Sequence, residues 1–203
     1  MTPVVPPAGT IRAIVVGASA GGVDALSQLL PALTAGTPLS LFIVVHLPRN
    51  RPSLLVEIFK SKCALPVREA EDKEPVAPGT VYFAPPDYHL LLERGPSLAL
   101  STDELVHFSR PSIDVLFDSA ADVYGQQLLG IILTGANEDG AAGLEAVHAA
   151  GGITVVQQPE SAQSAAMVMA ALKRVAADHV LTLDDIASLL KSLSRVESPC
   201  TLE

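Results

Sequence analysis

The feature that most constrains the fold is a repeated pairing of a short apolar run with an amphipathic segment. The first run, Ile11–Val16, is unbroken after Arg12, rich in β-branched residues, and followed by Gly17. Such a run is typical of a strand that is buried on both faces. After Gly22, apolar residues recur at spacings of three and four as far as Leu33, which indicates a helix. A strand, a glycine turn and a helix form the first half of a βαβ unit.

The same pairing recurs along the chain. Further buried strands are predicted at 39–45, 127–134 and 153–156, and further helices at 54–60, 113–124, 141–150, 162–172 and 184–193. In the middle, the short apolar runs 81–84, 90–92 and 98–100 lie between turn residues and predict hairpins. Because parallel strands need helical crossovers, we expect an α/β fold: a doubly wound, mostly parallel sheet in a Rossmann-like three-layer sandwich with a β-hairpin region. We expect one domain at 11–193, with tails at 1–10 and 194–203.

Composition excludes several classes of protein. Hydrophobic residues make up 49% of the 203 residues and charged residues 17%, which is too apolar for a disordered chain. The formal net charge is −9 and Lys and Arg do not cluster, so nucleic acid is not an expected partner. No apolar stretch approaches the roughly 18 residues of a membrane span, and the start lacks the basic region of a signal peptide. We expect a cytoplasmic protein without membrane insertion. Cys63 and Cys200 form neither a disulfide framework nor a zinc site.

The glycine turn after the first strand carries a candidate nucleophile. Residues 17–21 match the pattern Gly-x-Ser-x-Gly, in which a serine, here Ser19, is held on a tight turn between strand and helix. The N–H groups that open the helix, at Ala20 and Gly21, lie close by as oxyanion donors. Two other interpretations remain open: a variant of the dinucleotide fingerprint Gly-x-Gly-x-x-Gly, and a tight turn that only requires small residues.

The end of the second strand bears on this choice. A dinucleotide site needs Asp or Glu there to bind the ribose hydroxyls, whereas this chain has His46. At the carboxyl end of the strand beside the first one, His46 is placed to take a proton from Ser19.

The loop after the strand at 127–134 carries two acids, Glu138 and Asp139. An acid at this edge could orient the histidine and stabilise its protonated form. Asp139 could instead be a helix N-cap, and Glu138 a solvated charge, and position alone does not choose between them. The chain order serine, histidine, acid differs from that of ordinary α/β-hydrolases.

Taken together, these motifs resemble one family, the CheB-type protein-glutamate methylesterases of bacterial chemotaxis. The shared segments are Ile14–Gly22, Val45–Pro48 with Pro52–Leu55, Ala84–Leu90, Arg110–Phe117, Leu133–Gly135 with Asp139–Gly143, and Gln158–Ala162.

The resemblance implies a serine hydrolase with the catalytic triad Ser19, His46 and Asp139, Asp139 rather than Glu138 being the acid. The family removes methyl groups from glutamate γ-methyl esters on the cytoplasmic helices of chemoreceptors, and some members deamidate glutamines. The family needs no cofactor and no metal. Ala136 lies in the loop that lines the site in this family. Arg110 could line the cleft and face the substrate, or form a surface salt bridge.

The sequence departs from the family in three places. Ala136-Asn137 stands where Met-Gly is common, Met167-Val168 where Met-Pro is usual, and only residues 1–10 precede the first strand, where full-length members carry a receiver domain. We therefore expect no phosphorylation in cis, and a separate receiver-domain protein is a candidate partner. The alternative function is a catalytically weak regulatory or binding module of a chemosensory system that uses the same cleft. A small-molecule serine esterase and a nicotinamide-binding domain are further alternatives.

Overall fold

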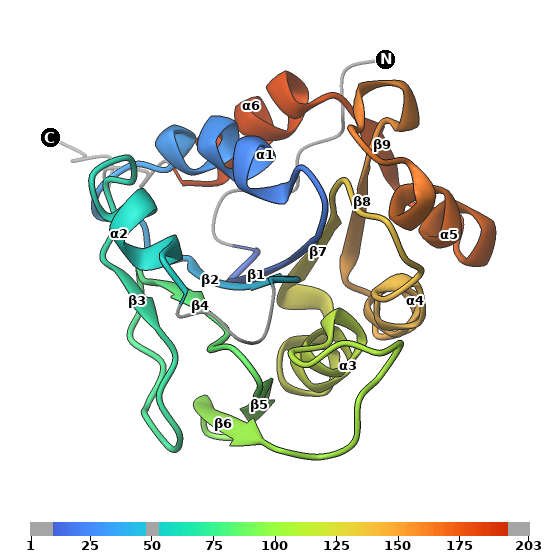
Figure 1. Ribbon diagram of the computed structural model, residues 1–203. Helices are drawn as coiled ribbons and strands as arrows, with labels where there is room; N and C mark the ends of the chain where they lie inside the picture. Colours follow the sequence, from blue (N-terminus) through green and yellow to red (C-terminus); the bar gives the residue numbers. More distant parts are fainter. Residues whose placement is uncertain (1–9, 48–52, 195–203) are drawn as a thin grey trace, which may run out of the picture.

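The computed structural model describes residues 10–47 and 53–194 and contains a seven-stranded parallel sheet in the order β3-β4-β2-β1-β7-β8-β9 (Figure 1). The strands are β1 (Ala13–Ala18), β2 (Ser40–Val45), β3 (Val67–Glu69), β4 (Val81–Phe83), β7 (Leu128–Ile132), β8 (Ile153–Gln157) and β9 (His179–Leu181). Every pairing in this sheet is parallel. The predicted α/β class is confirmed. The predicted tails lie almost wholly outside the described residues.

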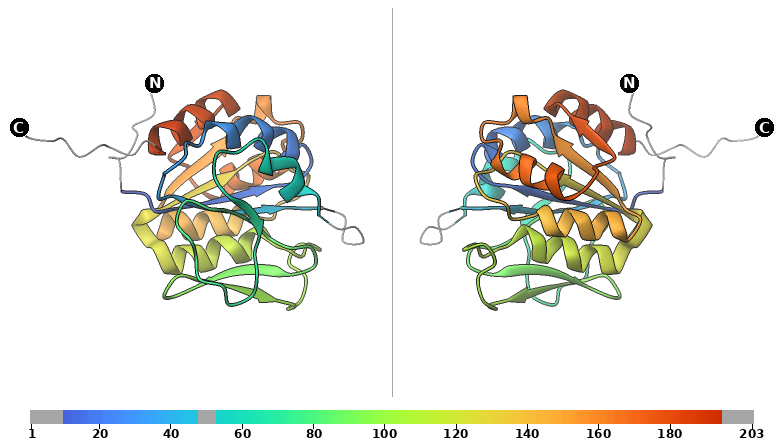
Figure 2. Two further views of the ribbon diagram at one scale, coloured as in Figure 1. Left: turned by 90° about the vertical axis from the view of Figure 1, so that its left-hand side faces the viewer. Right: turned by 90° about the vertical axis from the view of Figure 1, so that its right-hand side faces the viewer.

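Helices cover both faces of the sheet, so the domain has three layers (Figure 2). They are α1 (Gly22–Leu29), α2 (Leu55–Lys60), α3 (Ile113–Tyr124), α4 (Ala141–Ala149), α5 (Ala166–Arg174) and α6 (Leu183–Leu193), with short 3-10 turns η1 (Leu30–Ala32), η2 (Gly125–Gln127) and η3 (Pro159–Ser161). Helices α1 and α6 lie on one face, and α3 and α4 on the other. None of the described helices is long and apolar enough to cross a membrane.

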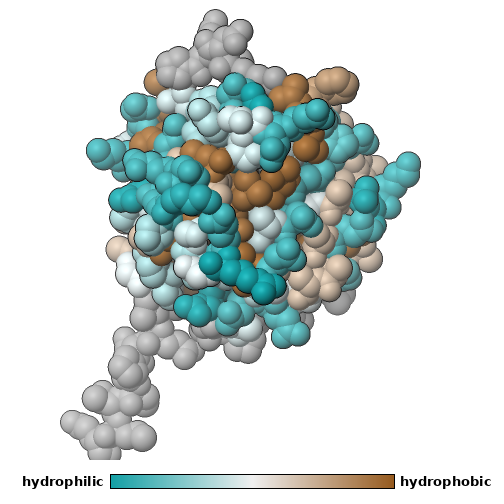
Figure 3. All heavy atoms as spheres, turned by 90° about the horizontal axis from the view of Figure 1, so that it is seen from below, coloured by the Kyte–Doolittle hydropathy of each residue, from teal (hydrophilic) through white to brown (hydrophobic). Residues whose placement is uncertain are grey.

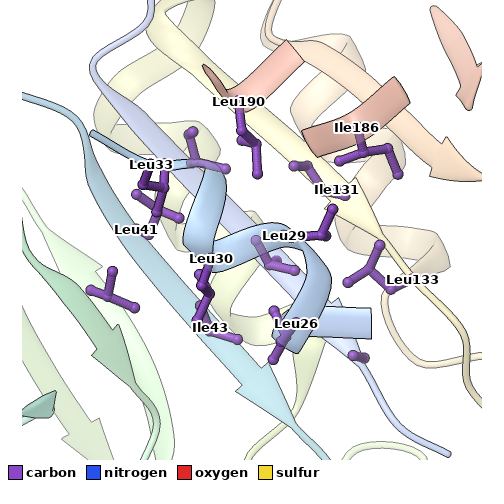
Figure 4. Packing of buried hydrophobic residues seen from close by; sticks show 14 of the residues in the cluster. Leu26, Leu29, Leu30, Leu33, Leu41, Ile43, Ile131, Leu133, Ile186 and Leu190 are labelled. Carbon is purple, nitrogen blue, oxygen red and sulfur yellow. The ribbon is translucent and has the colours of Figure 1, made fainter. Parts of the chain in front are cut away.

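The apolar stripe of the first helix is buried against the sheet, as its spacing predicts. Leu26, Leu29 and Leu30 pack on side chains of β2 and β7, with α6 beside them (Figure 4). Each is almost completely buried. Full burial of a leucine side chain contributes about 1.5–3 kcal/mol, so this layer holds α1 in place at the end of β1. That placement fixes the turn between the two elements.

The middle of the chain forms a second, two-stranded antiparallel sheet from β5 (His89–Glu93) and β6 (Ser97–Ser101). The predicted hairpin there is confirmed. It packs against α3, where the N–H of Leu92 donates to Ser119 Oγ at 3.1 Å. Seen from below, from the side of this hairpin, the surface is mostly hydrophilic with a few hydrophobic side chains near its centre (Figure 3).

The hairpin interpretation was wrong for the run 81–84. Val81–Phe83 is strand β4, which pairs in parallel with β2 and β3 inside the main sheet and is fully buried. The prolines and charges of the preceding segment hide this crossover, because β3 is only three residues long and half exposed. Strand β9 was not predicted for the same reason of length. The helix expected from residue 162 begins at Ala166, after the turn η3.

The strand order places a topological switch point at β1. The chain leaves β1 toward β2 on one side and later returns to β7 on the other. In open α/β sheets, the crevice outside the carboxyl ends of the strands at such a point is the usual place for a ligand. The three candidate residues of the triad all follow strands that meet there.

Candidate active site

Ser19, His46 and Asp139 come from the carboxyl ends of three neighbouring strands. Ser19 directly follows β1, and His46 directly follows β2. Asp139 lies in the loop between β7 and α4. The N–H of His46 donates to the carbonyl oxygen of Ala18 at 3.1 Å, which continues the parallel register and sets the histidine beside the serine turn.

The turn that carries Ser19 is anchored to Thr134. The N–H of Ser19 donates to the carbonyl oxygen of Thr134 at 2.9 Å, and Thr134 Oγ1 donates to the carbonyl oxygen of Ala20 at 2.8 Å. The N–H of Ser164 in turn donates to Thr134 Oγ1 at 2.9 Å. Thr134 itself is buried. One threonine therefore fixes the backbone of both Ser19 and Ala20.

Gly21 is the N-cap residue that joins this turn to α1. Its φ is +82°, in the left-handed region that glycine favours, and a Cβ there would lie 2.5 Å from Gln163 Oε1. In the described part of the chain, the N–H groups of Ala20 and Gly21 donate to no backbone carbonyl. These two donors lie at the N-terminus of α1, where the helix dipole also favours negative charge. This arrangement suits an oxyanion.

His46 is hydrogen-bonded to Asp139 through Nε2, which lies 2.8 Å from Asp139 Oδ2. Because a carboxylate only accepts, this contact places the ring proton on Nε2. Nδ1 then carries the lone pair and is the nitrogen left to accept a proton from Ser19. In the serine protease arrangement the two nitrogens have the opposite roles, but the chemistry is the same.

Asp139 is completely buried and accepts four hydrogen bonds. Besides His46, its donors are the N–H of Ile113 at 2.8 Å, the N–H of Asp114 at 3.0 Å and Ser112 Oγ at 2.8 Å. Burial alone would raise the pKa of this carboxyl, but the hydrogen bonds from His46 and the two N–H groups outweigh burial, and the pKa lies below its usual value. Asp139 is therefore ionised at neutral pH, beside the histidine.

Glu138, the other acid of the loop, lies outside this arrangement. Its side chain is 71% exposed, and its Oε1 lies 3.4 Å from His107 Nδ1. His107 Nε2 also lies 3.4 Å from Asp114 Oδ2. These two contacts place His107, a loop residue, at the edge of the site.

Three further residues, to which the sequence pattern assigns no role, support the site. Ser112 is the N-cap of α3, Asp114 lies in the first turn of the same helix, and His89 is buried behind them. A serine directly before an apolar helix is a recognisable capping signal. No comparable signal in the sequence marks His89.

A pocket of about 790 Å³ lies beside the site. Its lining includes Phe108, Asn137, Glu138, Met169 and Lys173. Phe108 is 94% exposed and Met169 is also exposed. The described residues contain no group of three or more His, Cys, Asp or Glu side chains that could hold a metal ion.

One protein-family model, described as CheB methylesterase, matches residues 14–190 of the chain. The chain belongs to the CheB methylesterase family. A relative from Leptospira interrogans is 44% identical over 184 residues, which cover 91% of this chain and 95% of that protein. A relative from Bordetella parapertussis, named protein-glutamate methylesterase/protein-glutamine glutaminase, is 40% identical over 186 residues, but these are only 53% of its length. The crystal structure of the Thermotoga maritima CheB methylesterase catalytic domain matches with a TM-score of 0.86 at 32% identity, covering 90% of this chain and 98% of that one.

The segments 136–137 and 167–168, where the sequence departs from the pattern that the resemblance implies, lie near Gly135. Met167 is buried against this glycine, where a Cβ would lie 2.6 Å from its Sδ. The N–H of Met167 donates to the carbonyl oxygen of Gly135, and the N–H of Gly135 donates to that of Ser164, both at 3.0 Å. These bonds fix the start of α5, where the sequence has Val168 rather than the proline that the resemblance leads us to expect. Asn137 Nδ2 lies 3.4 Å from Ser109 Oγ, and Ala136 is exposed.

Arg110 uses most of its donors within the chain. Its Nε and Nη2 donate to Asp87 Oδ1 at 3.1 and 2.9 Å, and its Nη1 donates to the carbonyl oxygens of Thr102 and Asp103 at 2.6 and 3.0 Å. Of its five N–H groups, one on Nη2 remains for other partners. This geometry favours the salt-bridge interpretation over contact with a substrate.

Proposed function

We propose that this protein is a protein-glutamate methylesterase that also hydrolyses glutamine side-chain amides, with Ser19 as nucleophile, His46 as general base and acid, and Asp139 as the orienting acid. One observation carries the proposal: a buried, ionised carboxylate is hydrogen-bonded to the histidine that follows β2, directly beside the serine that follows β1. Membership of the CheB methylesterase family and the names of its relatives support the same reaction.

The reaction begins with attack of Ser19 Oγ on the carbonyl carbon of the ester. His46 Nδ1 takes the hydroxyl proton, because Nε2–H is already bonded to Asp139. The carbonyl oxygen becomes an anion, which the N–H groups of Ala20 and Gly21 stabilise. The negative charge of Asp139 stabilises the imidazolium that forms.

The intermediate then breaks down. The bond to the methoxy group breaks, and the proton on His46 Nδ1 passes to that group, so methanol leaves and an acyl ester of Ser19 remains. Water attacks this ester with His46 again as base, and the product is a glutamate carboxylate with Ser19 restored. With a glutamine side chain, ammonia leaves in place of methanol. Each turnover adds one negative charge to the substrate protein.

The substrate is a cytoplasmic helix of a chemoreceptor, and the protein acts in the cytoplasm. The pocket that includes Phe108 and Met169 supports this assignment, because an apolar lining beside the reacting residues suits the side chains of a helix. A separate receiver-domain protein is a further proposed partner. No cofactor and no metal takes part in the proposed steps.

The test is methanol release from a purified receptor fragment that carries glutamate γ-methyl esters. We expect Ser19→Ala to abolish release while its thermal unfolding stays within a few degrees of the wild type, because only a hydroxyl is lost. A fluorophosphonate should label the wild type at Ser19 and leave the variant unlabelled. Failure to label the wild type, with no methanol release, would instead favour the catalytically weak binding module. Labelling with no release would favour a small-molecule esterase.

A further inference from the structure

His89 lies outside the proposed triad but is connected to it by hydrogen bonds. It is the first residue of β5 and is only 1% exposed. Its Nδ1 accepts from the N–H of Ser112 at 3.1 Å, and its Nε2 lies 3.0 Å from the carbonyl oxygen of Glu104. An amide N–H can only donate and a carbonyl can only accept, so the ring proton is on Nε2 and both nitrogens are engaged.

Ser112 connects His89 to Asp139. Ser112 Oγ donates to Asp139 Oδ1 at 2.8 Å, and the other carboxylate oxygen, Oδ2, accepts from His46 Nε2 at 2.8 Å. An unbroken series of hydrogen bonds thus runs from the hairpin sheet to the catalytic histidine. We infer that His89 is a positioning residue for His46 that acts through Ser112 and Asp139. The inference rests on the proposed function.

His89 Nδ1 is the one acceptor of the Ser112 N–H in the described part of the chain. Ser112 is the N-cap of α3 and follows Pro111, so its buried N–H lies outside the helical hydrogen bonds, and His89 Nδ1 is its acceptor. A buried N–H without a partner is unfavourable. Loss of Nδ1 would therefore displace the backbone of Ser112 and, with it, the direction of Oγ.

Loss of the acceptor at His89 Nδ1 is expected to slow the chemical step rather than to unfold the site. Asp139 would still accept from the N–H groups of Ile113 and Asp114, so its carboxylate stays near the start of α3. Without Ser112 Oγ its orientation toward His46 is less restrained. An interaction that matters only when the imidazolium forms changes kcat and leaves KM nearly unchanged.

Two substitutions of His89 separate its two hydrogen bonds. An Asn side chain places its amide oxygen near the position of Nδ1, whereas Gln places its amide near the position of Nε2. We expect His89→Gln to lower kcat for methanol release by roughly ten- to a hundredfold with little change in KM, and His89→Asn to restore kcat to within about threefold of wild type. The matched control is Leu92→Ala, a buried residue on the same strand that makes no contact in the series.

A purely structural role of His89 predicts a different pattern. An equal loss of kcat in His89→Asn and His89→Gln would overturn the inference. So would a loss of kcat in Leu92→Ala as large as that in His89→Gln, if the two variants lower Tm by the same amount. A double-mutant cycle gives a second test: in a Ser112→Ala background, His89→Gln should cause less than about a threefold further loss. Additive losses would contradict action through Ser112. Fluorophosphonate labelling of the wild type at Ser19 tests the proposed function separately, since it does not depend on the His89 variants.

Discussion

Asp139 accepts hydrogen bonds from the N-terminus of α3, where Asp114 lies, and Asp114 accepts hydrogen bonds from the N-terminus of α4, which follows Asp139. Asp139, just before α4, accepts from the N–H groups of Ile113 and Asp114 at the start of α3. Asp114, in the first turn of α3, accepts through Oδ1 from the N–H groups of Gly140 and Gly143 at the start of α4, at 2.9 and 2.6 Å. The carboxylate of Asp139, the proposed orienting acid, is therefore held by the same contacts that join α3 and α4.

The first prediction concerns the acid of the triad. Asp139→Asn should reduce turnover by roughly 10⁴, because the amide nitrogen can donate to His46 Nε2 and so place the ring proton on Nδ1, which then cannot accept from Ser19. Glu138→Gln is the control and should stay close to wild type, since Glu138 lies outside the arrangement. Methanol release measures both. Equal losses in the two variants would contradict the assignment of Asp139.

The second prediction concerns pH and stability. Because the pKa of Asp139 is lowered in the folded state, its charge stabilises the fold above the ordinary Asp range, and this contribution is lost as pH falls through the folded-state pKa. The difference in free energy of unfolding between wild type and Asp139→Asn should therefore shrink between pH 7 and about pH 3. Urea unfolding at both pH values measures it. A difference that grows toward low pH would contradict the lowered pKa.

The third prediction is that the contribution of Asp114 to the free energy of unfolding should change with pH in the opposite direction. Burial, together with the nearby charge of Asp139, raises the pKa of Asp114 despite its hydrogen bonds from Gly143 and Gly140. Its ionisation therefore costs stability in the folded state as pH rises through the raised pKa. Asp114→Asn, whose amide oxygen can still accept from both glycines, should lose less stability at pH 7 than at low pH, relative to wild type. Urea unfolding at both pH values measures this difference. A larger loss of stability in Asp114→Asn at pH 7 than at low pH would contradict the raised pKa of Asp114.

A fourth prediction concerns Thr134, which anchors the turn that carries Ser19. Thr134→Val removes the hydroxyl that donates to the carbonyl oxygen of Ala20 and should lower the free energy of unfolding by about 1–3 kcal/mol. It should also lower kcat, because the N–H of Ala20 is a proposed oxyanion donor. Thr134→Ser keeps the hydroxyl and is the matched control. Wild-type kcat in the valine variant would show that the turn holds its shape without this anchor.

The positions of Ser19 and His46 could be predicted because each directly follows an apolar run that is long enough to be recognised as a strand. Neighbouring parallel strands end at one edge, so the two side chains had to lie near each other. The choice of Asp139 over Glu138 came from the family resemblance. The sequence pattern allowed both, and only the fold shows that one carboxylate points to the start of α3 while the other points to His107.

The support behind the triad could not be predicted from sequence spacing. His89 and Ser112 are 23 residues apart, and their contact depends on how the hairpin sheet packs against α3, which no periodicity encodes. Strand β4 was misplaced for a related reason, since a three-residue run between prolines fits a hairpin and a parallel strand equally well. Pairing with β2 decides between them.

The last prediction concerns substrate binding. Phe108 is 94% exposed at the tip of a two-residue turn in which His107 and Phe108 have φ values of 48° and 59°. Left-handed backbone at two consecutive non-glycine residues is unfavourable, and two hydrogen bonds between Val106 and Ser109, at 2.8 and 3.2 Å, hold the turn in this form. The turn thus presents an apolar ring at the edge of the pocket beside the site.

If this ring is covered by the substrate helix, Phe108→Ala should raise KM for the methylated receptor fragment about tenfold or more, since burial of a phenylalanine contributes about 1.5–3 kcal/mol. Turnover at saturation should stay near wild type, because Phe108 is not one of the residues proposed to act in the bond-breaking step. The control is Val180→Ala on the edge strand β9, which is also an exposed apolar side chain but does not line the pocket. An unchanged KM in Phe108→Ala, or an equal rise in Val180→Ala, would exclude this turn as the docking site. A fall in kcat at constant KM would instead place Phe108 among the residues that position the catalytic groups.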